Sequence, residues 1–210
     1  MLLIVDYCLL HNQNSDSFLC LISDFIAGDL HIVHYWSATN TTSKKLDTIF
    51  LDPRHTPWDI IWEIVNNNIA TLYNLIQNLR YIVHKQSITK ILIISSVAAL
   101  RTWKNFWLDA IQKWAVHAMA RSLAIDLTKE WIYITEIMPW TTDSWYYDSP
   151  ATVYAKIERW REFGYIYAFD NFPLLAPMRV AETVRFVINT PAHFREISLI
   201  PYGQHPHLWA

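Results

Sequence analysis

Short apolar runs, separated by longer segments with helical periodicity, are the feature that most limits what this chain can fold into. A run of four to seven mostly apolar residues suits a strand that is buried on both faces. Strands that alternate with helices are typical of a parallel sheet with right-handed crossover connections. We therefore predict an α/β fold with a mostly parallel sheet. The predicted strands are LLIV (2–5), LHIVHYW (30–36), LDTIFL (46–51), KILIIS (90–95), WIYITEIM (131–138) and EISLIP (196–201).

Helical segments are predicted between these strands. Thr56 is suited to cap one of them, with Pro57 at its first position, where a missing N–H costs nothing. No repeat, low-complexity tract or change of composition divides the chain, and 210 residues suit one core better than two. We therefore expect a single domain, residues 1–210. The predicted helices are 15–28, 56 to about 87, roughly 104–129, 150–162 and 177–189.

Charge and apolar content limit the partners and the surroundings of the chain. A net charge of −2 and a pI near 6.5 give no electrostatic reason to expect nucleic-acid binding. The first apolar run meets Asp6 after LLIV, too soon for a signal peptide, and no uninterrupted apolar run reaches a membrane span. We expect no membrane insertion and a soluble cytoplasmic protein, with the mitochondrial matrix as the alternative for an assembly subunit.

Cysteine and histidine offer little for redox or metal chemistry. Cys8 and Cys20 cannot form a disulfide framework and are read as reduced thiols. His31 with His34, and His205 with His207, lack helical i,i+4 spacing and an acidic or cysteine companion nearby in sequence. We expect no metal site.

Glycine is scarce, and its scarcity limits what the backbone can bind. The chain has three glycines, Gly28, Gly164 and Gly203, where average usage predicts about fifteen. Glycine is needed where the backbone turns with positive φ or approaches a ligand closely. Few such places can exist in this chain.

Residues 68–140 carry a specific pattern. NIATLYNLIQ, ILIISSVAAL, KWAVHAMARSLAIDL and ITEIMP follow one another in a fixed order, with Ser96 thirteen residues before position 109 and Lys113 four residues beyond it. This pattern resembles that of the short-chain dehydrogenase/reductase family, and the tail MRVAETVRFVI with EISLIPYG resembles the family's closing helix and strand. The resemblance implies a Rossmann-like three-layer sandwich, shortened in its N-terminal part between residues 36 and 46.

The resemblance also carries the family's catalytic positions onto this chain. Asn68, Ser96 and Lys113 match three of the four, and Asp109 stands where the family has its catalytic tyrosine. An aspartic acid with an ordinary pKa of about 3.9 is ionised at neutral pH and has no proton to give. Losing a general acid typically costs about 10²–10⁴ in rate. These four positions are therefore interpreted as vestigial.

A structural interpretation covers the same residues. Asp109 and Lys113 are spaced i,i+4 in the favourable acid-before-base order, worth about 0.2–0.5 kcal/mol on a helix. Asn68 would stabilise a helix irregularity, and Ser96 would cap backbone at a strand end. We favour this interpretation over a redesigned catalytic pair.

Three turns that contact the dinucleotide in the family are altered here. The glycine-rich turn after the first strand is replaced by DYCLLHNQNSDS, which contains no glycine. The Asn-Asn-Ala-Gly turn is replaced by DPRH (52–55), and the Pro-Gly near the nicotinamide by Pro139–Trp140. The sequence therefore predicts that no NAD(P) binds and that Trp140 occupies the family's glycine position.

Three functions remain open. The first is a catalytically inactive structural, assembly or binding subunit, a homo-oligomer or part of a larger assembly. Family members pair through helices that here span about 68–85 and 104–129, and whether their aromatic residues fill an interface or this chain's own core stays open. These aromatics are Tyr73, Tyr81, Trp103, Phe106, Trp107 and Trp114.

The other two functions use the vacated cleft. One is a cofactor-independent enzyme similar to halohydrin dehalogenases, suggested by TWK (102–104), Trp140 and the C-terminal HPHLWA. In that group Asp109 and Lys113 would not match, and an anionic Asp109 would repel a departing halide. The third function is a small-molecule sensor, because clefts at the carboxyl ends of parallel strands are common ligand sites.

Overall fold

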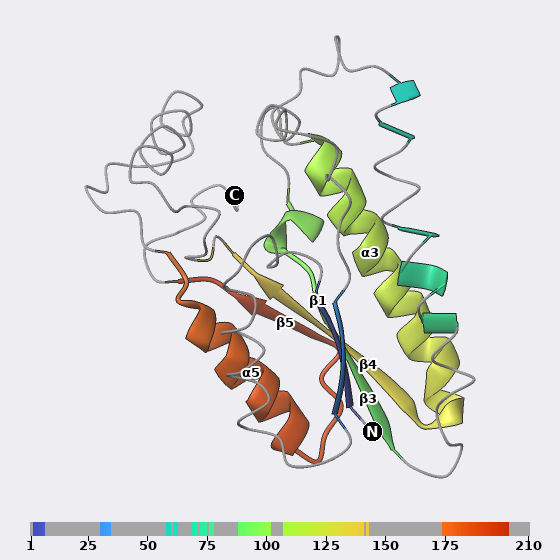
Figure 1. The fold of residues 1–210 in the computed structure, drawn as a ribbon, viewed down its shortest axis with the longest axis vertical. Helices are drawn as coiled ribbons and strands as arrows, with labels where there is room; N and C mark the ends of the chain where they lie inside the picture. The colour runs from blue at the N-terminus through green and yellow to red at the C-terminus, as the bar shows by residue number, and fades with distance from the viewer. Residues whose placement is uncertain are drawn as a thin grey trace.

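A computed structural model describes the core of the chain (Figure 1). Of β1 and β2 only the backbone is described, and the same holds for residues 108 and 109 of the long helix. The predicted strand 46–51, the helices 15–28 and 150–162, and the shortened region 36–46 lie outside the described residues. The described residues are 2–6, 30–34, parts of 58–77 (58–59, 61–62, 69–70, 72–74 and 76–77), 88–101, 107–140, 142 and 174–201.

The described strands form one parallel sheet. Its order is β2-β1-β3-β4-β5, and every neighbouring pair is parallel. This confirms the predicted α/β fold, because parallel neighbours need crossover connections and helices supply them. The strands are β1 (Leu2–Asp6), β2 (Leu30–His34), β3 (Thr89–Ile94), β4 (Ile132–Pro139) and β5 (Glu196–Leu199).

Two long helices flank the sheet on opposite faces. α3 (Trp107–Asp126) connects β3 to β4 and continues into the 3-10 helix η2 (Leu127–Glu130), while α5 (Pro177–Asn189) precedes β5. Figure 1 shows α3 on one side of the sheet and α5 on the other. The prediction for 177–189 matches α5, and the helix predicted over 104–129 is described from Trp107 onward. Among the described residues, no helix has the length and apolar content to cross a membrane.

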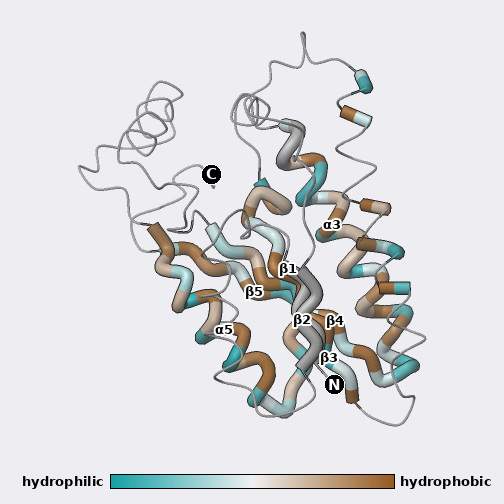
Figure 2. The backbone as a smooth tube through the Cα atoms, in the orientation of Figure 1, coloured by the Kyte–Doolittle hydropathy of each residue, from teal (hydrophilic) through white to brown (hydrophobic). Residues whose placement is uncertain are grey.

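Alternation along the strands divides the core into two layers. Ile91, Ile93 and Ile134 face α3, and Leu92 and Ile94 face α5, as expected for side chains that alternate across a sheet. Figure 2 shows hydrophobic and hydrophilic residues alternating along α5, which is typical of a helix with one buried face. The described part of the helical segment 58–77 joins the α3 side, because Leu72 and Ile76 are buried in the same cluster.

Candidate functional site

The order of the described strands has a topological switch point, which lies at the carboxyl ends of the strands. β1 lies between β2 and β3, so the chain leaves β1 for one neighbour and later returns on the other side. Asp6, the last residue of β1, is in register with Ile94, the last residue of β3. Ligands of open α/β sheets bind at such a point. The sequence that follows Asp6 contains no glycine before Gly28.

A cluster of buried polar side chains lies near the carboxyl ends of β3 and β4. Glu136 of β4 is 1% exposed, and each of its carboxylate oxygens has a hydrogen-bond partner. The Ser95 hydroxyl donates to Oε1 at 2.5 Å, and Nδ1 of His117 lies 2.6 Å from Oε2. A buried carboxylate is costly unless it is paired and hydrogen-bonded, and these two contacts meet that need. The cluster connects α3 and β4 to Ser95, the residue that directly follows β3.

This cluster was not predicted from the sequence. Glu136 interrupts the apolar strand run at a position that shares the α3 face with Ile134, and that is the signal that could have found it. Its partners could not have been read from the sequence, since Ser95 is 41 residues away and His117 is 19 residues away.

The order of these three residues differs from that of a hydrolase triad. In a Ser-His-Asp triad the imidazole lies between the nucleophile and the carboxylate, so that it can take the hydroxyl proton. Here the carboxylate of Glu136 lies between Ser95 and His117. Ser95 is also fully buried, which leaves no room for a substrate at its oxygen. The arrangement suits a structural bridge.

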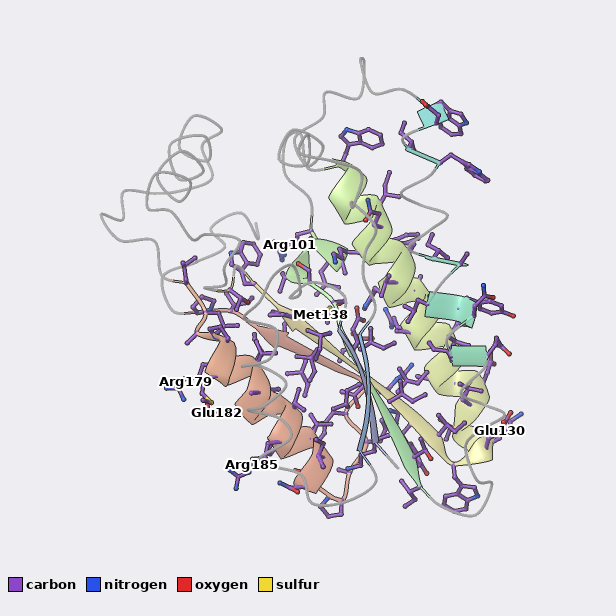
Figure 3. All side chains as sticks on the ribbon, in the orientation of Figure 1. Arg101, Glu130, Met138, Arg179, Glu182 and Arg185 are labelled. Carbon is purple, nitrogen blue, oxygen red and sulfur yellow. The ribbon has the colours of Figure 1, made fainter. Side chains whose placement is uncertain are left out.

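An apolar cluster covers the carboxyl ends of β3 and β4. Val97 and Ala99 of the 3-10 helix η1 (Val97–Ala99) are buried with Met138, and Trp140 and Ile200 pack against them. Figure 3 labels Met138 at this place, with Arg101 just beyond η1. The Trp140 N–H donates to the Leu199 carbonyl at 2.9 Å, which fixes the backbone of Trp140 beside β5. Partial burial lowers the pKa of Arg101 from its usual value.

Comparison with known proteins connects this geometry to a family. The sequence model of a family described as "Enoyl-(Acyl carrier protein) reductase" matches residues 27–163. The chain belongs to this family, within the short-chain dehydrogenase/reductase superfamily. No curated protein sequence matches the chain significantly.

Solved structures with the same fold include dehydrogenases of this superfamily. A 4-hydroxyisoleucine dehydrogenase complexed with NADH has a TM-score of 0.65 at 11% identity, covering 94% of this chain and 96% of its own. An alcohol dehydrogenase from the archaeon Thermococcus sibiricus, complexed with 5-hydroxy-NADP, has a TM-score of 0.63 at 14% identity, covering 98% and 99%. A small-chain dehydrogenase in complex with NADPH has a TM-score of 0.64 at 11% identity, covering 96% and 97%. At these identities the similarity shows the fold.

The short-chain dehydrogenase/reductase positions inferred from the sequence are placed as follows. Ser96 caps η1, and its Oγ accepts a hydrogen bond from the Ala98 N–H at 3.2 Å, which is the backbone capping expected of it. Lys113 is buried on α3, with 4% of its surface exposed. Asn68 and the side chain of Asp109 lie outside the described residues, so the Asp109–Lys113 ion pair stays a prediction.

The metal prediction concerns residues that are only partly described. Among the described residues, no group of three or more His, Cys, Asp or Glu side chains could hold a metal ion. The side chains of His31 and His34, and the pair His205 and His207, lie outside what the structure describes.

Proposed function

We propose that this member of the short-chain dehydrogenase/reductase superfamily has lost NAD(P)-dependent redox activity and acts as an assembly or binding subunit. Two of the similar solved structures contain NADH or NADPH, so the proposal separates this chain from those two proteins. Three observations support the loss of cofactor chemistry, and one supports assembly.

The position of Trp140 is the observation that carries the proposal. The indole packs against η1 and Met138 at the carboxyl edge of the sheet, on the position where the family resemblance expects a glycine beside the nicotinamide. A tryptophan adds a large apolar side chain where the family has only a hydrogen atom. Packing into a cluster with buried members also makes its displacement by a ligand unfavourable.

The other two observations concern the phosphate and the proton. No glycine occurs between Tyr7 and Ala27, so the chain that follows β1 at the switch point lacks the residue that lets backbone N–H groups approach a pyrophosphate. Asp109 replaces the tyrosine that would transfer the proton. Loss of the proton donor alone would leave a protein that still binds the cofactor. Loss of the proton donor together with loss of the glycines after β1 supports a protein without redox chemistry.

Exposed aromatic side chains support an assembly role. The sequence left open whether aromatics of the two helical segments fill the core or an interface. Tyr73 is 48% exposed and Trp114 is 63% exposed, so these two do not fill the core. Trp107 is partly buried, and Tyr81, Trp103 and Phe106 lie outside the described residues. Aromatic residues are enriched at interfaces between proteins.

Calorimetric titration of the purified protein with NADH and with NADPH tests the proposal. We expect no binding tighter than about 1 mM, which corresponds to about −4 kcal/mol. An active dehydrogenase of the same superfamily, titrated in parallel, is the positive control. The Trp140→Gly variant shows whether the indole alone blocks the site. Binding of either cofactor by the natural protein in the micromolar range would overturn the proposal.

A further inference from the structure

We propose that the C-terminal turn of α5 forms a binding site for a monovalent cation of the size of ammonium or potassium, which the natural protein fills with the ammonium group of its own Lys90. This inference is independent of the proposed function. It comes from the arrangement of three main-chain carbonyl groups around one side-chain nitrogen.

The ligands of the proposed site are three carbonyl oxygens at one end of α5. Each lies 2.8 to 3.0 Å from Nζ of Lys90 and accepts a hydrogen bond from it. An ammonium group has three N–H donors and no acceptor, so these three bonds use all of its donors. The nitrogen therefore lies where a cation bound by the same oxygens would lie. The oxygens belong to Val187, Ile188 and Thr190.

The end of the helix holds these oxygens in place without help from Lys90. The N–H of Thr190, the C-cap residue of α5, donates to the Phe186 carbonyl at 3.0 Å, and its Oγ1 donates to the same oxygen at 2.7 Å. The Ala192 N–H donates to the Thr190 carbonyl at 2.8 Å. Val187 is buried in the core between α5 and the sheet. Because none of these contacts involves the ammonium group, we expect the three oxygens to stay together when it is removed.

Ligand type and distance select the class of cation. Magnesium binds oxygen at about 2.0–2.1 Å and calcium at about 2.3–2.6 Å, and both are usually held by at least one carboxylate. The three oxygens here are neutral and surround a centre 2.8 to 3.0 Å away, which suits a larger ion of single charge. Carbonyl oxygens likewise replace the hydration shell of K⁺ in potassium channels. The C-terminus of a helix adds a partial negative charge of about half a unit, which favours one positive charge.

The side chain that fills the site comes from the sheet. Lys90 is the second residue of β3 and lies on the same face as Leu92, which packs against α5. Because its ammonium group is attached to the chain, the effective concentration of this group at the site exceeds that of a free cation. The natural protein should therefore not respond specifically to ammonium or potassium ions in solution.

Cation rescue of a variant without the lysine tests the site. Lys90→Ala removes the ammonium group and leaves space for a free cation. We expect its Tm to be higher in ammonium chloride and in potassium chloride than in tetramethylammonium chloride of equal ionic strength, by about 2–4 °C. Tetramethylammonium has the same charge, but it has no N–H donor and is too large for the site. The natural protein should show no such difference, and equal Tm values of Lys90→Ala in the three salts would overturn the proposal.

Lys90→Met is the matched control. It removes the same charge, but its terminal methyl group takes the place of the lysine Cε, to which Nζ is bonded, and so blocks the site. We expect no cation-specific rise of Tm in this variant. A rise as large as that of Lys90→Ala would overturn the proposal, because the effect of the salts would then not depend on an open site.

Proton exchange of the lysine in the natural protein gives a test that needs no variant. The ammonium protons of Lys90 should exchange with water at least about tenfold more slowly than those of Lys129, because three carbonyls hold the former and the latter side chain is exposed. NMR of a nitrogen-labelled sample measures both rates. Exchange at Lys90 as fast as at Lys129 would overturn the proposal.

Discussion

His117 of α3 and Glu136 of β4 meet in the core, with Nδ1 and Oε2 2.6 Å apart and 7% and 1% of their side chains exposed. The second carboxylate oxygen of Glu136 accepts a hydrogen bond from Ser95. These contacts hold α3 against β4, the strand that ends one residue before Trp140.

Removing one member of this pair should destabilise the fold strongly. We expect His117→Leu to lower the free energy of unfolding by about 3–5 kcal/mol, because it leaves a buried carboxylate without its partner. The double variant His117→Leu with Glu136→Leu should be less destabilised than the single variant, since it buries no charge. Urea denaturation of His117→Leu, Glu136→Leu and the double variant measures the coupling energy between the two side chains. If the losses of unfolding free energy in the two single variants add up to the loss in the double variant, a direct interaction between His117 and Glu136 is contradicted.

Lys90 stabilises the C-terminal end of α5. Its Nζ donates to the carbonyls of Val187 at 2.8 Å, Ile188 at 3.0 Å and Thr190 at 2.8 Å. A helix leaves its last carbonyls unpaired, and a lysine is well suited to bond them. Lys90→Met should lower the free energy of unfolding by about 1–3 kcal/mol. Arg179→Met, which removes only an exposed pair with Glu182, should cost about 0.5 kcal/mol or less in the same denaturation assay.

Lys90 should also give the stability a specific pH dependence. Burial lowers the pKa of Lys90 from its usual value of 10.5. Between the lowered pKa and the usual value, the unfolded chain binds more protons than the folded one, so stability contributed by this residue rises with pH. The difference in unfolding free energy between the natural protein and Lys90→Met should therefore grow as pH is raised toward 10.5. A difference that shrinks over this range would contradict the shift.

Thr89 is a position where a simple substitution should stabilise the protein. The residue is fully buried, and its Oγ1 has no hydrogen-bond partner among the described residues. Thr89→Val removes the unsatisfied hydroxyl with little change of shape and should raise the free energy of unfolding by about 1 kcal/mol. The matched control is Thr135→Val on β4, where the hydroxyl donates to the Phe194 carbonyl, and the same change should destabilise by about 1 kcal/mol. Thermal melts of both variants check the opposite signs.

Trp131 has a backbone conformation that favours glycine. It ends η2 with φ of 62° and ψ of 25°, in the left-handed region, and is 55% exposed. A side chain at such a position costs about 1–2 kcal/mol relative to glycine. We expect Trp131→Gly to be more stable than Trp131→Ala by about 1 kcal/mol, a comparison that cancels the loss of the indole. Chemical denaturation of the two variants side by side decides it, and equal stability would contradict this strain.

Most of the described fold followed from local pattern. The runs KILIIS and WIYITEIM became β3 and β4 within one residue at each end, and 177–189 became α5, because apolar periodicity and burial point to the same element. The site was less predictable. Ser96 capping was anticipated from its place at a strand end, whereas the buried Glu136 contacts were not, because they join residues that are 41 and 19 positions apart in the sequence.

The sequence by itself determined the α/β alternation, the absence of glycine after the first strand and an aspartic acid at position 109, since each depends on residue types in chain order. Only the tertiary structure decided which polar residues meet in the core and which aromatics stay exposed. Packing α3 on the sheet buries His117 beside Glu136 and leaves Trp114 at the surface three residues earlier. Helical periodicity marks two faces, but both carry apolar residues here, and contact with β4 selects the one that is buried.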